Sequence, residues 1–274
     1  MPKSDYQFRK GKNNSNNRTI QADRDTAIIE SIGHYPVLTL TLLHLRLPHI
    51  HLRKLEQRTA RLAQKRMINR YELLDGRLIY TTLSVPKTAH PQFEHRLMSS
   101  TWWLTWDLAT ESTDIQTLSR TFEHDLRVSD FPGSIPDNVC VYRSAMTEAL
   151  VIECDTGSEA LTGQLSRKTY LFHKLLTHFQ QRREIREWLG GVPFRILTIT
   201  RGERRVEHLR KLLYDWHDDT GTPVFGSDAF LITDESQYSP QRPASLLGKI
   251  WTTAQSDNLV SLLDSPRTQE RRDE

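Results

Sequence analysis

Two apolar runs within residues 139–154, separated by a short polar stretch, limit the possible folds more than any other part of the sequence. Such runs are typical of buried strands, and a turn centred near Ala145 would pair them antiparallel. In that register Asp137 lies opposite Glu153, and Asp155 shares a face with Glu153 because side chains alternate along a strand. The pattern predicts three carboxylates at one end of a hairpin, where their charges repel unless a cation lies between them.

The sequence offers two candidates for that cation. The helix expected after the hairpin has an apolar stripe that Lys168 interrupts, and a lysine on the inward face of a helix needs a partner. Lys168 is therefore predicted to be the counter-ion of the acids. Alternatively, Asp137 and Glu153 would hold a divalent metal, because Mg²⁺ and Mn²⁺ prefer carboxylate oxygens. The stripe consists of Leu161, Leu165, Phe172 and Leu175.

The segments on both sides of the hairpin predict an α/β layer structure. A tryptophan-rich helix is expected over residues 92–109, and residues 117–131 are interpreted as another helix that ends near 128. Residues 192–200 and 229–232 are typical of buried strands, and residues 202–216 are typical of a helix. This alternation predicts a sheet covered by helices. Packing between elements is expected of Trp102, Trp103 and Trp106.

Charge divides the chain into a basic front and an acidic back. Residues 1–90 hold 16 Lys and Arg against 7 Asp and Glu, a net charge of +9, whereas the remaining 184 residues hold 21 against 27, a net of −6. Such an asymmetry is typical of two domains with two tasks. We expect a disordered basic arm over 1–22, a DNA-binding domain over 23–90, an α/β domain over 91–256 and a disordered charged tail over 257–274.

The basic front has the pattern of a winged helix, in which three helices precede a hairpin. Helices are expected over residues 23–34, 38–46 and 48–70, the last beginning at a proline that suits a first turn. Two short strand-like runs then flank an Asp75-Gly76 turn. This order predicts a winged helix-turn-helix with a basic third helix.

One face of the third helix is predicted to bind duplex DNA. Its lysines and arginines recur at helical spacing, and residues 51–70 hold seven Lys and Arg against one acid, Glu56. Such a stripe suits contacts with phosphates and a position in the major groove. The alternative is a solvated basic helix with no nucleic-acid partner. The predicted DNA-binding residues are Lys54, Arg58, Arg61, Lys65 and, in the hairpin, Arg77.

The sequence contains no pattern of a secretion signal or a membrane span. The first residues lack an apolar core, and the longest apolar run is interrupted by His44 and Arg46. Cys140 and Cys154 both fall in expected strands, which favours buried free thiols over a disulfide. These patterns predict a cytoplasmic protein without a membrane partner.

Pro136-Asp137, followed across the hairpin by Glu153-Cys154-Asp155, resembles the PD-(D/E)XK signature of restriction-endonuclease-like proteins. Asp155 stands where that signature has a lysine, and Lys168 would be the relocated lysine. Glu123 would be a fourth acid, carried by a helix. The resemblance implies that Asp137 and Glu153 hold Mg²⁺, and that the lysine helps to activate water for phosphodiester hydrolysis.

Seven short motifs follow one another along the back of the chain: FEHDLRVSDF, PDNVCVY, LVIECDTGSE, RKTYLFHKL, FRILTIT, FLITD and GKIW. Together with the basic front they resemble the replication-relaxation family of plasmid and mobile-element proteins, over roughly residues 24–252. An aspartate in the place of Asp155 is ordinary for this family. The resemblance implies DNA binding in plasmid replication and DNA relaxation more than it implies cleavage.

We therefore expect an α+β protein, in which an N-terminal winged helix-turn-helix precedes an α/β domain resembling the PD-(D/E)XK nuclease fold. Its expected function is that of a DNA-binding accessory protein in replication, relaxation or transfer of a plasmid or other mobile element. Double-stranded DNA is the expected partner, with relaxase or replication proteins beside it. One alternative is a winged-helix transcriptional repressor, which would act as a homodimer. The other is a Mg²⁺-dependent nuclease, whose catalytic residues would be Asp137, Glu153, Asp155 and Lys168.

Overall fold

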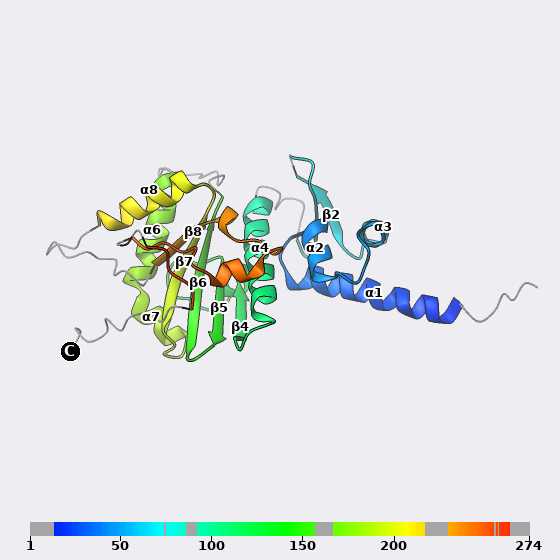
Figure 1. Ribbon diagram of the computed structural model, residues 1–274, viewed down its shortest axis with the longest axis horizontal. Coiled ribbons are helices and arrows are strands. Elements are labelled where there is room, and N and C mark those ends of the chain that lie inside the picture. Colours follow the sequence, from blue (N-terminus) through cyan, green and yellow to red (C-terminus); the bar gives the residue numbers. More distant parts are fainter. Residues whose placement is uncertain are drawn as a thin grey trace, which may run out of the picture. The chain divides into compact units, whose positions relative to one another are not determined.

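The computed structural model has two compact units, residues 1–89 and 90–274, and each is described by itself. Both units combine helices and strands (Figure 1). The structure describes residues 14–73, 75–85, 92–156, 167–216, 230–254, 256 and 258–263, without the side chains of 14–19 and 167–169.

The first unit consists of three helices and a small antiparallel sheet. The strand order is β1-β3-β2, and the β2–β3 register places Glu72 opposite Leu78. The predicted hairpin is therefore confirmed, and Gly76 occupies its turn with a φ of 81°, a region that favours glycine. The elements are α1 (Asn14–His34), β1 (Leu38–Thr39), α2 (Leu40–Arg46), α3 (Leu52–Gln64), β2 (Asn69–Glu72) and β3 (Leu78–Thr81).

The core of the first unit explains how α3 is oriented. Leu55, Thr59 and Leu62 recur at spacings of four and three residues and are all buried, so one face of the helix packs inward. Ile28 of α1 and Ile79 of β3 are fully buried in the same unit. Burial of this apolar stripe leaves the opposite face of α3 to solvent.

Three expectations for the first unit are wrong in detail. The arm expected over 1–22 is helical from Asn14, because α1 begins there, while residues 1–13 lie outside the described part. The third helix begins at Leu52, where the His51 side chain accepts a hydrogen bond from Arg53 N, and not at residue 48. It ends before Arg66, whose φ is 56°.

The second unit is built on a five-stranded sheet in the order β4-β5-β6-β7-β8. Pairing is antiparallel from β4 to β6 and parallel from β6 to β8. The elements are α4 (Phe93–Thr110), β4 (Gln116–Phe122), α5 (Glu123–Leu126), β5 (Asn138–Arg143), β6 (Thr147–Asp155), α6 (Arg167–Gln180), α7 (Arg182–Trp188), β7 (Phe194–Thr200), α8 (Glu203–Tyr214) and β8 (Phe230–Asp234), followed by the short 3-10 helices Glu235–Gln237 and Pro243–Leu247.

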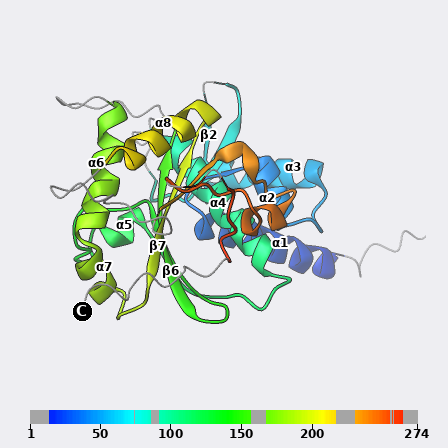
Figure 2. The ribbon, with the colours of Figure 1, turned by 60° about the vertical axis from the view of Figure 1, so that its left-hand side comes forward.

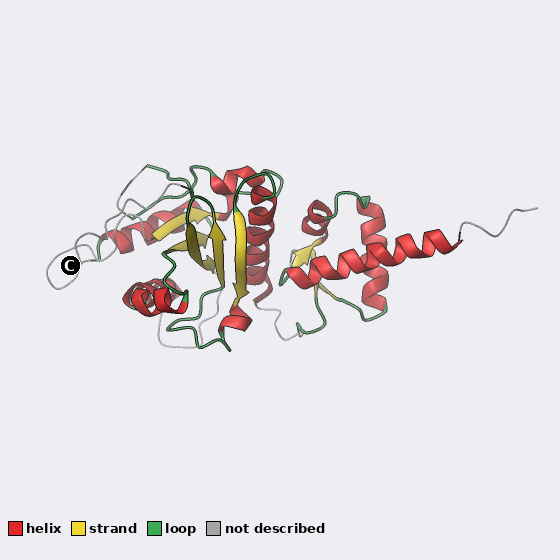
Figure 3. Ribbon diagram, turned by 90° about the horizontal axis from the view of Figure 1, so that it is seen from below, coloured by secondary structure: helices red, strands yellow, loops and turns green. Residues whose placement is uncertain are grey.

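Helices cover both faces of this sheet. Helix α4 lies on one face, and α6, α7 and α8 lie on the other (Figure 1, and from below in Figure 3). Helices α6 and α8 are neighbours on their face (Figure 2), where Leu175 and Leu209 join Ile196 and Ile232 of the sheet in one apolar cluster. On α4, the predicted packing role of Trp102, Trp103 and Trp106 is confirmed, since all three are fully buried.

Two expectations for the second unit are wrong. Residues 117–131 do not form a helix ending near 128: most of the first half is strand β4, paired with β5, and the helix is limited to α5. Strand pairing with a distant segment has overridden local propensity. The tail expected from 257 is partly ordered, because Val260 pairs with Trp251 and Leu262 is buried.

Two further findings concern the two cysteines and the length and apolar character of the helices. Cys140 and Cys154 are buried free thiols, as predicted. Among the described residues, no helix is both long and apolar enough to cross a membrane.

Candidate functional site

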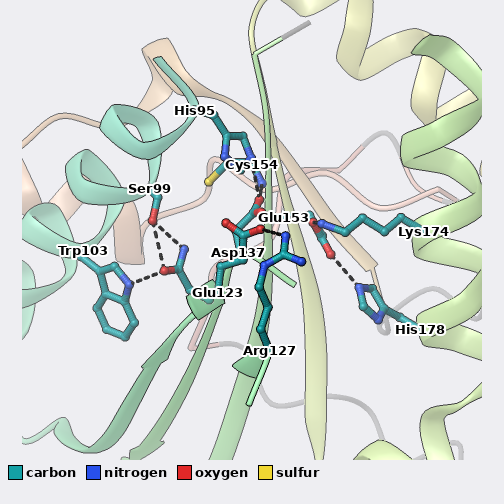
Figure 4. Close-up of polar contacts among 11 residues, drawn as sticks. His95, Ser99, Trp103, Glu123, Arg127, Asp137, Glu153, Cys154, Lys174 and His178 are labelled. Atoms are coloured by element: carbon teal, nitrogen blue, oxygen red, sulfur yellow. Dashed lines mark hydrogen bonds and ion pairs between the residues drawn. The ribbon is translucent and has the colours of Figure 1, made fainter. Parts of the chain in front are cut away.

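The β5–β6 hairpin brings Asp137 and Glu153 together. Asn138 is the register partner of Ile152, so Asp137, which directly precedes β5, lies opposite Glu153 as predicted. The Asp137 backbone N–H continues the pairing by donating to Ile152 O at 3.1 Å. Both side chains are buried, with exposed fractions of 6% and 1%. The site is drawn in Figure 4.

Asp137 is held by donors from both sides of the sheet. Its Oδ2 accepts a hydrogen bond from Cys154 N at 2.6 Å and lies 3.0 Å from Nε2 of His95 on α4. Its Oδ1 faces the other side, 3.6 Å from Nζ of Lys174 on α6. Asp137 lies at the end of a strand, so its carboxylate can contact groups on both faces of the sheet (Figure 4).

Glu153 is held by two cationic or potentially cationic groups of α6. Lys174 Nζ donates to Oε2 at 2.5 Å, and His178 Nε2 lies 2.6 Å from Oε1. Residues four apart lie on the same face of a helix, so Lys174 and His178 reach the sheet together. Lys174 therefore contacts both acids of the hairpin.

Burial and charge act in opposite directions on this cluster. Burial alone raises the pKa of Asp137, but Lys174, His95 and the Cys154 N–H outweigh it and hold that pKa well below its usual value. For Lys174, burial lowers the pKa, but Asp137 and Glu153 outweigh it and raise the pKa above its usual value. Asp137 and Lys174 are thus held in their charged forms.

A polar network from α4 fixes the start of β5. The fully buried Asn138 accepts a hydrogen bond from Trp103 Nε1 at 3.0 Å and donates one to Ser99 Oγ at 2.8 Å. These bonds satisfy the Asn138 amide, which would otherwise be costly to bury. Since Asn138 follows Asp137 directly, the network positions the carboxylate of Asp137.

Asp155 has a counter-ion of its own. It pairs with Arg205 of α8, and both side chains are largely buried. The prediction that Glu153 and Asp155 share a face is consistent with these contacts, because α6 and α8 cover the same side of the sheet. Among the described contacts, Glu153 meets Lys174 and His178 of α6, whereas Asp155 meets Arg205 of α8.

Two other predicted residues do not join the cluster in the described structure. The side chain of Lys168 lies outside the described residues, so its predicted role stays a prediction, and the lysine that contacts the acids is Lys174. The carboxylate of Glu123 pairs with Arg127, which directly follows the same short helix. Only the backbone N–H of Glu123 reaches the hairpin, donating to Asp137 O at 2.9 Å.

Sequence reasoning missed three residues of this site: His95, Lys174 and His178. A signal for the last two was present, because Lys174 and His178 are polar residues spaced four apart beside the buried Leu171 and Leu175. The role of His95 could not be predicted from the sequence, because a single histidine near the start of α4 is not part of any recurring spacing.

The donor set does not fit a resident metal. Among the described residues, no group of three or more His, Cys, Asp or Glu side chains is arranged to hold a metal ion. The oxygens of Asp137 and Glu153 instead face Lys174, His178, His95 and the Cys154 N–H. The tentative assignment of Asp137 and Glu153 as metal ligands therefore has no support in this geometry.

The predicted DNA-binding residues fall into two groups. Lys54, Arg61 and Lys65 are exposed, and none of them forms an ion pair with another described residue. Arg58 was expected on the same exposed stripe, but its side chain is only 13% exposed and pairs with Asp25 of α1. In the hairpin, Arg77 is exposed and donates to Asp75 Oδ2 at 2.5 Å.

The prediction also overlooked exposed cations. Arg53 lies on the outward face of α3, Arg66 follows the helix, and Arg70 belongs to β2. Together with Lys54, Arg61 and Lys65 they form what we call the cationic surface of the first unit.

The chain was compared with protein-family models, with curated proteins and with solved structures, and none of the three comparisons gave a match. The function proposed below is therefore based on the geometry of the cationic surface and on the sequence motifs.

Proposed function

We propose that the first unit is a winged helix that binds duplex DNA through α3 and the β2–β3 hairpin. The order of its elements supports this proposal: α1, β1, α2 and α3 precede an antiparallel hairpin whose second strand pairs with β1. In helix-turn-helix proteins, the helix in the position of α3 enters the major groove.

The cationic surface is the observation that carries the proposal. Its six side chains are exposed, and none forms an ion pair with another described residue. The opposite face of α3 is fixed in the core by Leu55, Thr59 and Leu62, so the helix presents its cations on a rigid support. Exposed cations in this arrangement suit the phosphates of duplex DNA, whose binding releases counterions.

Salt dependence is the direct test of this mode of binding. With roughly six to eight phosphates contacted, the logarithm of the association constant should fall against the logarithm of salt concentration with a slope of about −5 to −7. Gel-shift titrations of the full chain at several salt concentrations measure this slope. Absence of binding to any duplex, or binding that salt leaves unchanged, would contradict the proposal.

We also propose that this DNA binding serves replication, relaxation or transfer of a plasmid or other mobile element. The short motifs that resemble the replication-relaxation family support this role. A footprint confined to a replication or transfer origin is the expected result. A palindromic footprint upstream of the protein's own gene, bound by a dimer, would favour the repressor instead.

A further inference from the structure

The ammonium of Lys174 lies where a divalent ion would have to bind if it bridged the two acids of the hairpin. Its Nζ is 2.5 Å from Oε2 of Glu153 and 3.6 Å from Oδ1 of Asp137. We propose that Lys174 is the resident cation of this centre, that it excludes divalent ions from the native protein, and that its removal converts the two carboxylates into a Mg²⁺ or Mn²⁺ site.

Exclusion follows from the contacts of the four carboxylate oxygens. Asp137 Oδ2 is engaged by Cys154 N and His95, and Glu153 Oε1 by His178. The remaining oxygens, Asp137 Oδ1 and Glu153 Oε2, both face Lys174. A metal that bridged the two acids would have to displace the ammonium from the partners that neutralise it.

The displaced ammonium would be left at a site with little water. The Lys174 side chain is only 12% exposed, so separating it from both acids would leave a largely buried charge without compensation. Such uncompensated charges are strongly destabilising. Metal binding to the native protein is therefore opposed by the loss of the lysine contacts as well as by occupancy of the site.

The same geometry explains why the centre becomes a metal site once the lysine is removed. Two carboxylate oxygens would then face one position, and oxygen ligands from one or two carboxylates completed by water suit Mg²⁺ and Mn²⁺. Thr198 is the register partner of Glu153 on β7, is fully buried, and has an Oγ1 without a hydrogen-bond partner among the described residues. Its hydroxyl is a further oxygen donor on the same face.

The neighbouring pair of Asp155 and Arg205 provides a matched control. It lies on the same strand and is also a largely buried ion pair, but its arginine is paired with a single acid of β6. Removal of Arg205 therefore takes a cation away from one carboxylate of β6 instead of from two. A single carboxylate should bind divalent ions far more weakly than a bridging pair.

The test is thermal melting of the full chain with and without millimolar MnCl₂, combined with Mn²⁺ electron paramagnetic resonance to count bound ions. In Lys174→Gln we expect MnCl₂ to raise the melting temperature by roughly 5 °C or more, with one ion bound. The wild type and Arg205→Gln should show neither effect. In the double variant Lys174→Gln/Glu153→Gln the gain should disappear.

Several results would overturn the proposal. One is a wild type that binds Mn²⁺ and loses that binding in Glu153→Gln, because the ammonium would then not exclude the metal. Another is a folded Lys174→Gln variant that ignores MnCl₂. A Lys174→Gln chain that stays unfolded in MnCl₂ also counts against it, because metal between the acids should restore their neutralisation.

Discussion

The cationic surface of the first unit and the acid centre of the second use the same kinds of charged group in opposite ways. Lys54 and Arg61 on α3 are exposed and form no ion pair with another described residue. Lys174 on α6 is largely buried and contacts Glu153 and Asp137. The exposed cations remain available to an external anion, whereas the buried one is committed to the fold.

Arg58 shows that sequence position alone does not decide between these two situations. It belongs to the same helix as Lys54 and Arg61, yet it pairs with Asp25 of α1 and donates to Gln21 O at 3.1 Å. Around the helix axis, Arg58 lies less than a quarter turn from Lys54 and from Arg61. This small difference in direction is enough for Arg58 to contact a neighbouring helix while the other two side chains are exposed to solvent. The contact made, and not the residue type, determines the role.

The largest expected effect is the destabilisation of the second unit by Glu153→Gln. The change leaves Lys174 and His178 without the carboxylate that they share, and breaking a buried pair costs about 3–5 kcal/mol. Chemical denaturation of the full chain, followed by tryptophan fluorescence, measures the free energy of unfolding. We expect no metal-dependent nicking of supercoiled plasmid by the wild type or by Glu153→Gln.

Glu123→Gln is the matched control for that substitution. Glu123 is another acid beside the hairpin, but it pairs with the exposed Arg127, which directly follows α5. Its replacement should change the free energy of unfolding by less than about 0.5 kcal/mol. A Glu153→Gln protein that is as stable as this control, or metal-dependent nicking that Glu153→Gln abolishes, would show that the acids serve catalysis instead of stability.

The next effect is a loss of stability in acid that Asp137 controls. Its folded-state pKa is lower than the unfolded value of 3.8, so its contribution is present above that pH and is lost as the pH falls below it. The pKa of Lys174 is raised above 10.5, so its contribution is present below that pH and is lost as the pH rises through it. Asp137→Asn should therefore flatten the fall in stability between about pH 5 and pH 3.

Denaturant titrations of the wild type and Asp137→Asn across this pH range make the comparison. The wild type should lose more of its free energy of unfolding than the variant. Parallel curves for the two proteins would mean that Asp137 is not held in its charged form by its neighbours.

A smaller effect is expected from Arg58→Ala. Its pair with Asp25 is partly buried, with exposed fractions of 13% and 32%, so the loss should be about 1 kcal/mol in the stability of the first unit. Asp25→Asn should cost a similar amount, and the double variant should cost less than the sum of both. Simple additivity in this double-mutant cycle would mean that the pair contributes nothing to stability.

The sequence was sufficient to predict those features of the site that depend on local pattern. Two apolar runs joined by a turn centred near Ala145 predicted the register that places Asp137 opposite Glu153. The Asp75-Gly76 turn was equally clear, because Gly76 adopts a φ of 81° that favours glycine. In both cases the interacting strands are close in the chain.

The features that could not be predicted depend on packing between distant segments. Strand β4 was mistaken for a helix because its identity comes from pairing with β5. Lys174 lies 21 residues from Glu153, and its role depends on how α6 packs over β6. Arg58 lies 33 residues from Asp25, and no spacing in the sequence links the two.

The central claim, that exposed cations of α3 bind duplex DNA, requires a variant and a control of equal charge. The variant Lys54→Ala/Arg61→Ala/Lys65→Ala removes three exposed cations that form no ion pair with another described residue, so its fold should persist. The control removes three exposed cations from the second unit, namely Arg183, Arg204 and Lys211.

Fluorescence anisotropy with a labelled duplex, at several salt concentrations, compares the two proteins with the wild type. The α3 variant should lose at least about tenfold in affinity, and its salt slope should become shallower by nearly one unit for each contact removed. The control should retain wild-type affinity and slope. Unchanged affinity in a folded α3 variant, or an equal loss in the control, would contradict the claim.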